Sequence, residues 1–110
     1  MKITETELGI QREPFARPFG FKGSAFHEKW NMIVRLRDED GSESVGVGGL
    51  AVLWSDANVF NAHTEVGGNL LQASILESAL QHVMNREYAD PPSILADVLP
   101  KAFAYGRTIT

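Results

Sequence analysis

Apolar and polar side chains alternate clearly in the first half of this chain. In the segment 29–37 every second residue is apolar, namely Trp30, Met32, Val34 and Leu36, while the residues between them are mostly polar. A period of two predicts a strand in a sheet with one solvated face. Residues 2–12, rich in Thr and Ile, predict an earlier strand. Residues 44–48, where Val45 and Val47 share a side, predict a later one.

Turn-forming residues separate these three strands. Asp40-Gly41 is a strong hairpin signal between the second and third strands, because both residues tolerate positive φ. Pro14 and Pro18 each remove a backbone donor, so we expect them to end the first strand and to leave 14–28 as a long connection. The segment 48–68, bounded by two Gly-Gly pairs, is expected to be a second long connection. The three strands then form an antiparallel meander.

Helical spacing replaces the alternation after residue 68. Asn69 can cap a helix, with Gln72 three residues later in a capping-box arrangement. The apolar stripe of this helix consists of Ala73, Leu76, Ala79, Leu80, Val83 and Met84. Such a stripe predicts that the helix packs on the sheet.

A second helix is expected to begin at Asp90, where a capping residue precedes Pro91. Its inward-facing residues should be Ile94, Leu95, Val98 and Leu99. Pro100 is expected to kink or end it, and Gly106 to stop the segment that follows.

Strands followed by helices predict an α+β fold, a three-stranded antiparallel meander followed by two or three packed helices. One domain is expected over 1–110, with the sheet in 2–49 and the helices in 69–106.

Composition and charge argue against several classes of function. The net charge of -4, without clustered basic residues, argues against nucleic-acid binding. The absence of cysteine excludes disulfides and thiolate metal sites. Neither a signal peptide nor an apolar run of about 20 residues is present, so we expect no membrane contact and a soluble, cytoplasmic protein.

The usual catalytic patterns are missing. His27, His63 and His82 are too far apart for a short-spaced metal motif. The carboxylates of 38–40 sit at a hairpin tip, where nothing would desolvate them. The glycines of 45–49 do not form a dinucleotide-binding loop, since the residues after them give no helix cap. We therefore predict no catalytic residue and no metal site in this chain.

Large apolar residues gather in the two long connections. The first carries Phe19, Phe21 and Phe26 on a glycine-rich segment, and the second carries Leu53, Trp54, Val59 and Phe60. Two interpretations remain open. These side chains either close the end of a small core, or they cover another surface as an interface or a ligand lid.

A series of short motifs resembles a known family. In order along the chain they are Met1-Lys2-Ile3-Thr4, Arg17-Pro18-Phe19, Met32-Ile33-Val34-Arg35-Leu36, Asp40-Gly41 and Gly46-Val47-Gly48. Together they resemble the N-terminal domain of the mandelate racemase and muconate lactonizing enzyme group of the enolase superfamily, best over residues 2–49 and loosely through the helices. One position departs from the family. Its Gly-x-Gly-Glu pattern has a glutamate after the second glycine, whereas Gly48 is followed here by Gly49 and Leu50.

The resemblance implies a capping domain. In that family it covers the C-terminal end of a (β/α)-barrel, which performs the chemistry: magnesium-assisted abstraction of a proton α to a carboxylate in an isomerase or lyase, such as a racemase, dehydratase or cycloisomerase. Two capping-domain loops, here about 17–28 and 49–63, close over the substrate. The pocket residues implied in the parent enzyme are Phe19, Phe21, Lys22, Ser24, Phe26, Trp54 and Phe60.

Since the barrel is absent from these 110 residues, the resemblance implies that the chain alone is inactive and carries no cofactor. Its expected partners are the barrel domain of the parent and, through exposed apolar surface, a second copy of the chain. The alternative is a stand-alone ligand-binding or protein-interaction module that uses the aromatic loops. An independent small enzyme is the third option and the one with the least support.

Overall fold

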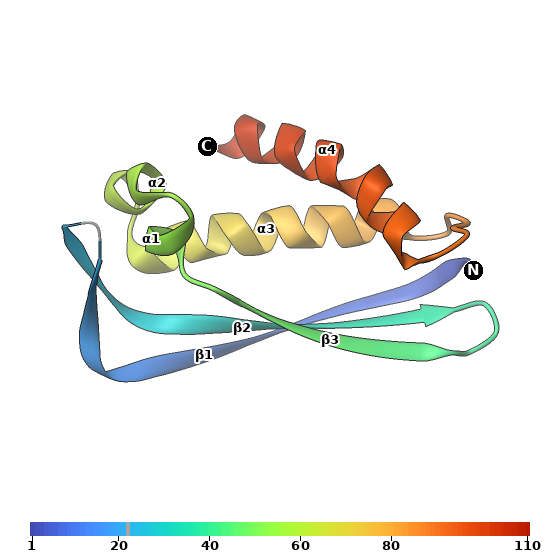
Figure 1. Cartoon of the computed structure of the whole chain (residues 1–110), viewed down its shortest axis with the longest axis horizontal. Helices are drawn as coiled ribbons and strands as arrows, with labels where there is room; N and C mark the ends of the chain where they lie inside the picture. Colours follow the sequence, from blue (N-terminus) through green and yellow to red (C-terminus); the bar gives the residue numbers. More distant parts are fainter. Residues whose placement is uncertain (22) are drawn as a thin grey trace.

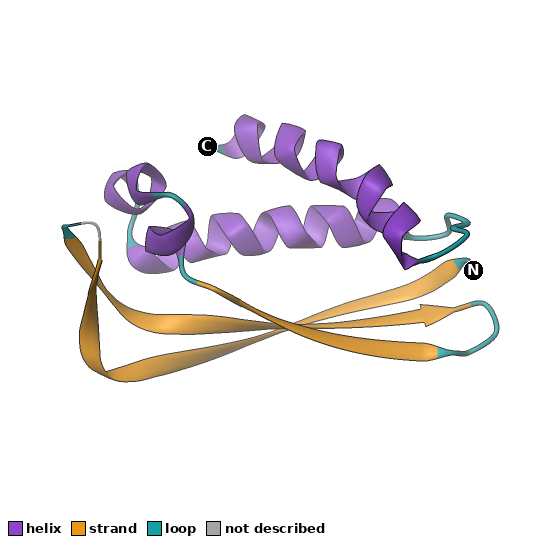
Figure 2. Cartoon of the chain, viewed as in Figure 1, coloured by secondary structure: helices purple, strands orange, loops and turns teal. Residues whose placement is uncertain are grey.

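The chain forms an antiparallel sheet covered on one face by helices (Figures 1 and 2). The computed structural model describes residues 1–21 and 23–110, and for Phe21, Trp54 and Ser55 it describes the backbone only. The strands are β1 (Ile3–Phe21), β2 (Ser24–Asp38) and β3 (Glu43–Leu50). The helices are α1 (Val52–Ser55), α2 (Ala57–Ala62), α3 (Glu65–Val83) and α4 (Pro91–Ile109). The sheet order β1-β2-β3 confirms the predicted meander and the α+β class.

The layers are stacked in the order sheet, α3, α4 (Figure 1). Trp30 and Met32 on β2 are buried against Ala73 of α3. At the other end of α3, Ile3 and Val83 pack with Tyr88. The apolar side of β2 therefore faces the helices, as the alternation predicts, and the stripe of α3 supplies the opposite side of the core.

The β2–β3 turn is the hairpin that Asp40-Gly41 predicts. Gly41 has a φ of 84°, in the region that favours glycine. Asp38 Oδ1 accepts hydrogen bonds from the backbone N–H of Asp40 at 2.9 Å and of Ser42 at 3.0 Å. These bonds replace backbone partners that the turn lacks.

The prediction that Pro14 and Pro18 end the first strand is wrong. β1 pairs with β2 over almost its whole length, up to Phe21 beside Ser24. The register shifts between Pro14 and Phe19. Since β1 is an edge strand, a proline there loses no hydrogen bond to a neighbour on its outer side. Instead of a loop, the aromatic residues of 14–28 lie on a long hairpin.

The predicted start of α3 is also wrong. The helix begins at Glu65, and Thr64 Oγ1 caps it by accepting from the Gly67 N–H at 2.8 Å. Asn69 is a fully buried residue inside α3. Gly68 lies in the first turns because a Cβ there would approach the Val52 methyl carbons to 2.8 Å. The glycines predicted to mark a boundary thus permit close packing of α3 on α1.

The segment 48–68, predicted as the second long connection, contains α1 and α2. Ala51 precedes α1 without a side-chain cap, which is why the sequence gives no cap signal there. Asp56 caps α2 through the N–H groups of Asn58 and Val59. Leu53 is fully buried, so it belongs to the core and not to an exposed loop surface.

The start of α4 at Asp90-Pro91 is confirmed, with Asp90 accepting from the Ser93 N–H at 2.9 Å. Its predicted end is wrong, because the helix continues through Pro100 and Gly106. A Cβ on Gly106 would lie 3.2 Å from the Ile75 Cδ1 atom, so the glycine allows α4 to approach α3.

Of the four residues expected to face inward on α4, Ile94 and Val98 pack on the core. Leu95 and Leu99 are 58% and 49% exposed. Because α4 packs mainly on α3, only a narrow side of it is covered.

Candidate functional site

The two segments with the predicted pocket residues, 17–28 and 49–63, lie at the same end of the molecule (Figure 1). Ser24 Oγ on β2 donates a hydrogen bond to Asn61 Oδ1 on α2, at 3.3 Å. The Glu65 carboxylate at the start of α3 accepts from the backbone N–H groups of His27 and Glu28, at 3.0 Å each. Helix α3 thus holds the tip of the β1–β2 hairpin beside α2.

Three phenylalanines form a cluster on this hairpin. Phe26 is 4% exposed. Its ring centre lies 5.3 Å from that of Phe15, edge to face, and 5.4 Å from that of Phe19. Such contacts add stability beyond the burial of apolar area. Phe26 serves as the buried base of the cluster, while Phe19 remains 48% exposed.

A cavity of about 470 Å³ opens beside this cluster. Its lining joins residues of both segments: Phe15, Phe19, Phe26, Lys29, Gly49, Leu50 and Ala51. The walls are mainly apolar, and Lys29 brings an ammonium group to them. An apolar hollow of this size with one charged group has the composition of small-molecule sites.

The structure brings some of the predicted pocket residues together and not others. Phe19 and Phe26 line the cavity. Ser24 contacts α2, and Phe60 is half-buried within α2, but neither lines the cavity. Lys22 lies outside the described residues, as do the side chains of Phe21 and Trp54; the backbone of Phe21 ends β1 and that of Trp54 lies in α1.

Lys29 and Gly49 are lining residues that the sequence analysis did not single out. The Lys29 side chain lies across Gly49, where an added Cβ would be 3.3 Å from Lys29 Cε. Gly49 therefore provides room for the lysine. The departure from the Gly-x-Gly-Glu pattern falls at this glycine and was the available signal.

A charge network on the surface supports the hairpin near the cavity. Arg12 donates two hydrogen bonds to Glu28, at 2.9 and 3.0 Å, and its guanidinium lies 5.5 Å from the centre of the Trp30 ring. Trp30 Nε1 donates to the same carboxylate at 2.6 Å. The hydrogen bonds from Arg12 and then Trp30 hold the pKa of Glu28 below its usual range. Glu28 therefore stays ionised, and its bonds hold Arg12 of β1 and Trp30 of β2 together near the cavity.

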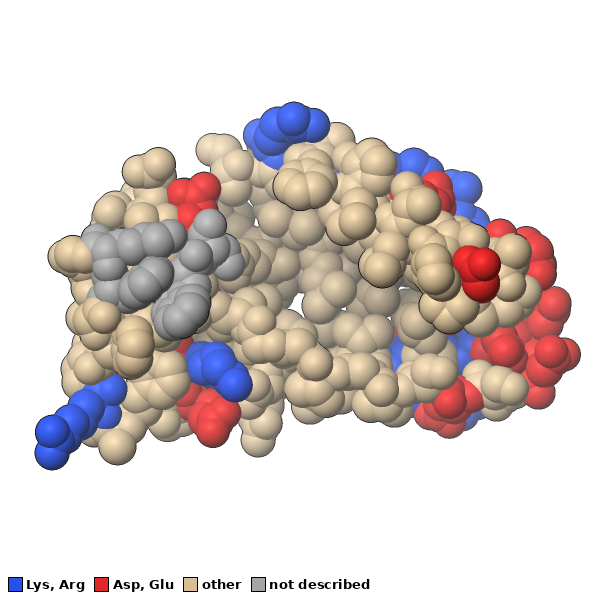
Figure 3. All heavy atoms as spheres, viewed as in Figure 1, with Lys and Arg blue, Asp and Glu red and all other residues tan. Residues whose placement is uncertain are grey.

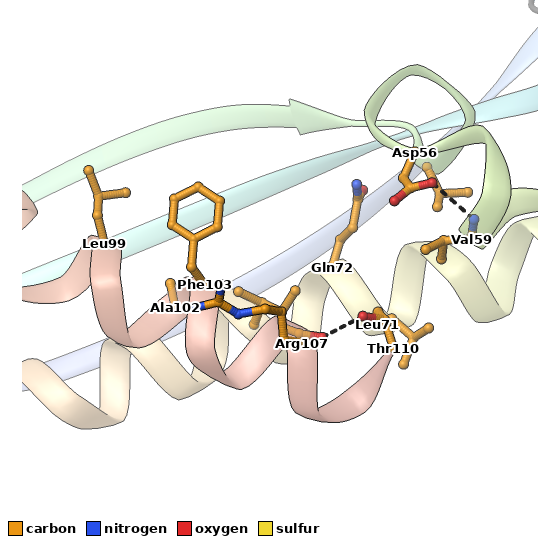
Figure 4. Close-up of a pocket in the computed structure, with 12 residues that line it drawn as sticks. Asp56, Val59, Leu71, Gln72, Leu99, Ala102, Phe103, Arg107 and Thr110 are labelled. Atoms are coloured by element: carbon orange, nitrogen blue, oxygen red, sulfur yellow. Dashed lines mark hydrogen bonds between the residues drawn. The ribbon is translucent and has the colours of Figure 1, made fainter.

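A second hollow, of about 430 Å³, lies between α4, α3 and the α1–α2 segment (Figure 4). It is lined by Val52, Asp56, Val59, Leu71, Gln72, Ile75, Leu99, Ala102, Phe103, Gly106, Arg107 and Thr110. The Asp56 carboxylate already caps α2, so few polar groups remain to orient a ligand. Among the described residues, the buried Gln72 Oε1 has no hydrogen-bond partner.

Neither hollow has the ligands of a metal site. Within residues 1–21 and 23–110, no group of three or more His, Asp or Glu side chains could hold a metal ion. In the same described part of the chain, no helix is both long and apolar enough to cross a membrane.

Comparison with known proteins gives matches among solved structures. No family model matches the sequence, and no curated protein does either. The L-Ala-D/L-Glu epimerase from Bacillus subtilis matches 88% of this chain at 19% identity and a TM-score of 0.54. A dipeptide epimerase from Methylococcus capsulatus, complexed with Mg and the dipeptide L-Arg-D-Lys, matches 91% at 24% identity and a TM-score of 0.54. An enolase-superfamily member from Roseovarius nubinhibens matches 92% at 24% identity and a TM-score of 0.51.

These matches cover nearly all of this chain but only 24%, 27% and 24% of the three solved chains. The chain therefore spans about a quarter of their length. At these identities the likeness concerns the fold. The chain shares its α+β fold with the matching quarter of these enzymes, one of which is an enolase-superfamily member.

Proposed function

We propose that this chain is the capping domain of an enolase-superfamily enzyme and that its two segments, 17–28 and 49–63, close over the substrate of a barrel domain. The observation that carries the proposal is the aromatic cavity. Its walls come from the hairpin tip and from the start of the second segment, in a fold that makes up about a quarter of the matching enzymes.

The parent reaction that we propose is an epimerisation by proton abstraction α to a carboxylate. The matching structures include epimerases, and the one from Methylococcus capsulatus is a magnesium complex. They support this class over a lyase. Magnesium, bound in the barrel, would supply Lewis-acid stabilisation of the negative charge that develops on the substrate. The described residues of this chain do not fit a metal site, and our proposal assigns the ion and the acid–base groups to the barrel.

The contribution of the chain itself is to exclude water and to shape the pocket. Phe15, Phe19 and Phe26 present apolar surface, which strengthens electrostatic interactions in the closed site and favours an apolar substrate side chain. Glu65 keeps the hairpin tip in place through its bonds to the backbone of β2.

Whether a barrel domain belongs to this chain can be tested by reading the coding sequence. The relevant parts are the DNA after the Thr110 codon and the neighbouring reading frames. We expect a barrel with spaced Asp and Glu ligands and lysine bases. The assembled enzyme with Mg²⁺ should exchange the α-proton of a dipeptide in D₂O, seen by NMR, whereas this chain alone should not. Exchange by the chain alone, or no barrel in its genomic neighbourhood, would instead support a small enzyme or a stand-alone module.

Two matched variants of the assembled enzyme test the cavity. Phe19→Ala removes exposed cavity wall, and we expect about a tenfold rise in KM for apolar substrates from the lost apolar contact. Phe103→Ala removes the same kind of side chain from α4, away from this cavity, and should leave KM unchanged. Equal effects of the two substitutions would contradict the assignment.

A further inference from the structure

The outer edge of β3 is an unprotected strand edge. It lies at the margin of the sheet, and residues 43–49 are all exposed, with Val45 at 64% and Val47 at 70%. Edge strands usually carry a lysine, a proline, a bulge or a covering element, because their free N–H and C=O groups pair with other chains. Residues 44–50 contain no charge and no proline, and no bulge interrupts their pairing with β2.

The helix-facing side of this edge is open as well. Gly46 and Gly48 share a face with Val34 and Met32, their partners on β2. A Cβ on either glycine would meet no atom within 4 Å. Helix α3 packs mainly on β1 and β2. Leu50, at the end of β3, packs against the core, whereas the helical layer leaves Gly46 and Gly48 uncovered. In the view of Figure 3, the middle of the molecule carries few charged side chains.

A cation and an anion mark the two ends of the same edge. At one end Lys29 lies across Gly49, with Nζ 3.6 Å from the position of a Cβ on that glycine. Within the described residues this ammonium forms no ion pair with a carboxylate. At the other end Glu43 receives hydrogen bonds from Arg35 and Arg37, which hold its pKa below the usual range and keep it ionised.

We propose that β3 pairs antiparallel with β3 of a second copy of this chain, centred on Gly46, to give a continuous six-stranded sheet. This register places Val45 opposite the partner's Val47. It also places Glu43 opposite the partner's Gly49, and hence beside the partner's Lys29. The two-fold axis repeats both pairs, so the contact has two ion pairs and two apolar pairs.

The side-chain faces restrict the alternatives. Antiparallel partners must point to the same face of the sheet, so registers that differ by one residue are excluded. A shift by two residues in one direction moves Glu43 past the end of the partner's β3, and a shift in the other places it opposite the partner's Val47. Only the register centred on Gly46 gives each carboxylate a cation at the edge.

The oligomeric state of the full chain tests the interface. Because one strand pair buries less than a standard interface, we expect a weak dimer, detected by sedimentation velocity between about 10 and 300 µM. Val47→Lys places a charge on the edge and should weaken association by at least about tenfold. Phe103→Lys adds the same charge at another apolar position, 69% exposed on α4, and should leave the dimer intact. Circular dichroism establishes that both variants are folded.

Single cysteines test the register, since the chain has none of its own. In the proposed dimer, position 46 faces itself at a Cα separation of about 4.5–5.5 Å, which suits a disulfide. Gly46→Cys should therefore cross-link under mild oxidation and run as a dimer without reductant. Gly48→Cys is equally open but lies opposite the partner's Ser44, so it should stay monomeric.

Three results would overturn the proposal. The first is a strictly monomeric wild-type chain throughout this concentration range. The second is dissociation by Phe103→Lys but not by Val47→Lys, which assigns the contact to α4. The third is cross-linking of Gly48→Cys without Gly46→Cys, which removes the Glu43–Lys29 pairing. None of these results bears on the capping role, which depends on the barrel and on the aromatic cavity.

Discussion

Asn69 Oδ1, inside α3, accepts a hydrogen bond of 2.9 Å from the backbone N–H of Val52, the first residue of α1. Both residues are fully buried. Ala51, the residue before α1, has no side chain that could accept this bond. Asn69, 17 positions after Val52, therefore supplies the missing cap. The same bond joins the segment 49–63 to α3.

Replacing Asn69 with alanine should lower the free energy of unfolding by about 2–3 kcal/mol, because it leaves the buried Val52 N–H unpaired and opens a small cavity. Urea denaturation measures the loss, and hydrogen exchange should show that the amides of 49–63 lose protection first. Asn58→Ala, at an exposed position of α2, serves as control. A loss below about 0.5 kcal/mol at Asn69 would mean that this bond does not hold α1.

Gly68→Ala should destabilise the protein although alanine is the better helix former. Helix propensity favours alanine by about 1 kcal/mol. The new Cβ, however, would lie 2.8 Å from both Val52 methyl carbons, and Val52 cannot rotate away easily because it is β-branched. Overpacking costs about 1–3 kcal/mol and should prevail.

The double variant Gly68→Ala with Val52→Ala provides the check, because it removes the clashing methyl groups. In thermal or urea denaturation it should be less destabilised than the sum of the two single changes. Gly48→Ala, where a Cβ meets nothing within 4 Å, is the control and should have little effect. If the loss of stability in the double variant equalled the sum of the two single losses, the clash with Val52 would be relieved in another way.

A polar cluster between α3 and α4 predicts the pH range of stability. Asp97 accepts hydrogen bonds from the Tyr88 hydroxyl at 2.7 Å and from Lys101 at 3.0 Å, and it lies 3.1 Å from His82 Nε2. Hydrogen bonds from Tyr88, then Lys101, lower the pKa of Asp97. Burial, followed by the bond to Asp97, raises the pKa of Tyr88 to about 12.

The two shifts act at opposite ends of the pH scale. Asp97 stabilises the fold above its unfolded pKa of about 3.9, and this contribution is lost as the pH falls below that value. Tyr88 stabilises it below its unfolded pKa of about 10, and this contribution is lost as the pH rises toward 12. Melting temperatures should therefore fall at both ends. Asp97→Asn should flatten the acid limb and Tyr88→Phe the alkaline limb; unchanged limbs would contradict these assignments.

Phe26 and Phe19 should differ in what they contribute. Phe26→Ala empties a buried site and should cost about 3 kcal/mol or more. Phe19→Ala, at a half-exposed position, should cost less than about 1 kcal/mol. Urea denaturation of the two variants gives the comparison. Similar losses would mean that Phe19 belongs to the core and does not serve mainly as a wall of the cavity.

The sequence predicts the parts of this fold in which one physical effect dominates. Alternation over 29–37 identifies β2, and Asp40-Gly41 identifies its turn, because each signal is local. Pro14 misleads because its tolerance depends on β1 being an edge strand. Asn69 misleads because its partner, Val52, is distant in the sequence.

The sequence likewise predicts the parts of the candidate site that have a local signal and misses those that depend on the fold. Aromatic residues between glycines point to Phe19 and Phe26, which line the cavity. Lys29 belongs to a regular strand by its spacing, and only the fold brings it across Gly49. Pro100 shows the converse, since a residue that usually breaks a helix is held inside α4 by the packing of that helix on α3.

The shift in register between Pro14 and Phe19 divides the β1–β2 hairpin into two parts with different constraints. On the sheet side of the shift, substitutions act on residues such as Trp30 and Met32 and so on folding itself. Beyond it, Phe26 is the one buried core residue among the described side chains of the hairpin tip. The tip of the hairpin can therefore accumulate mutations and acquire new ligand preferences while the domain that carries it remains stable.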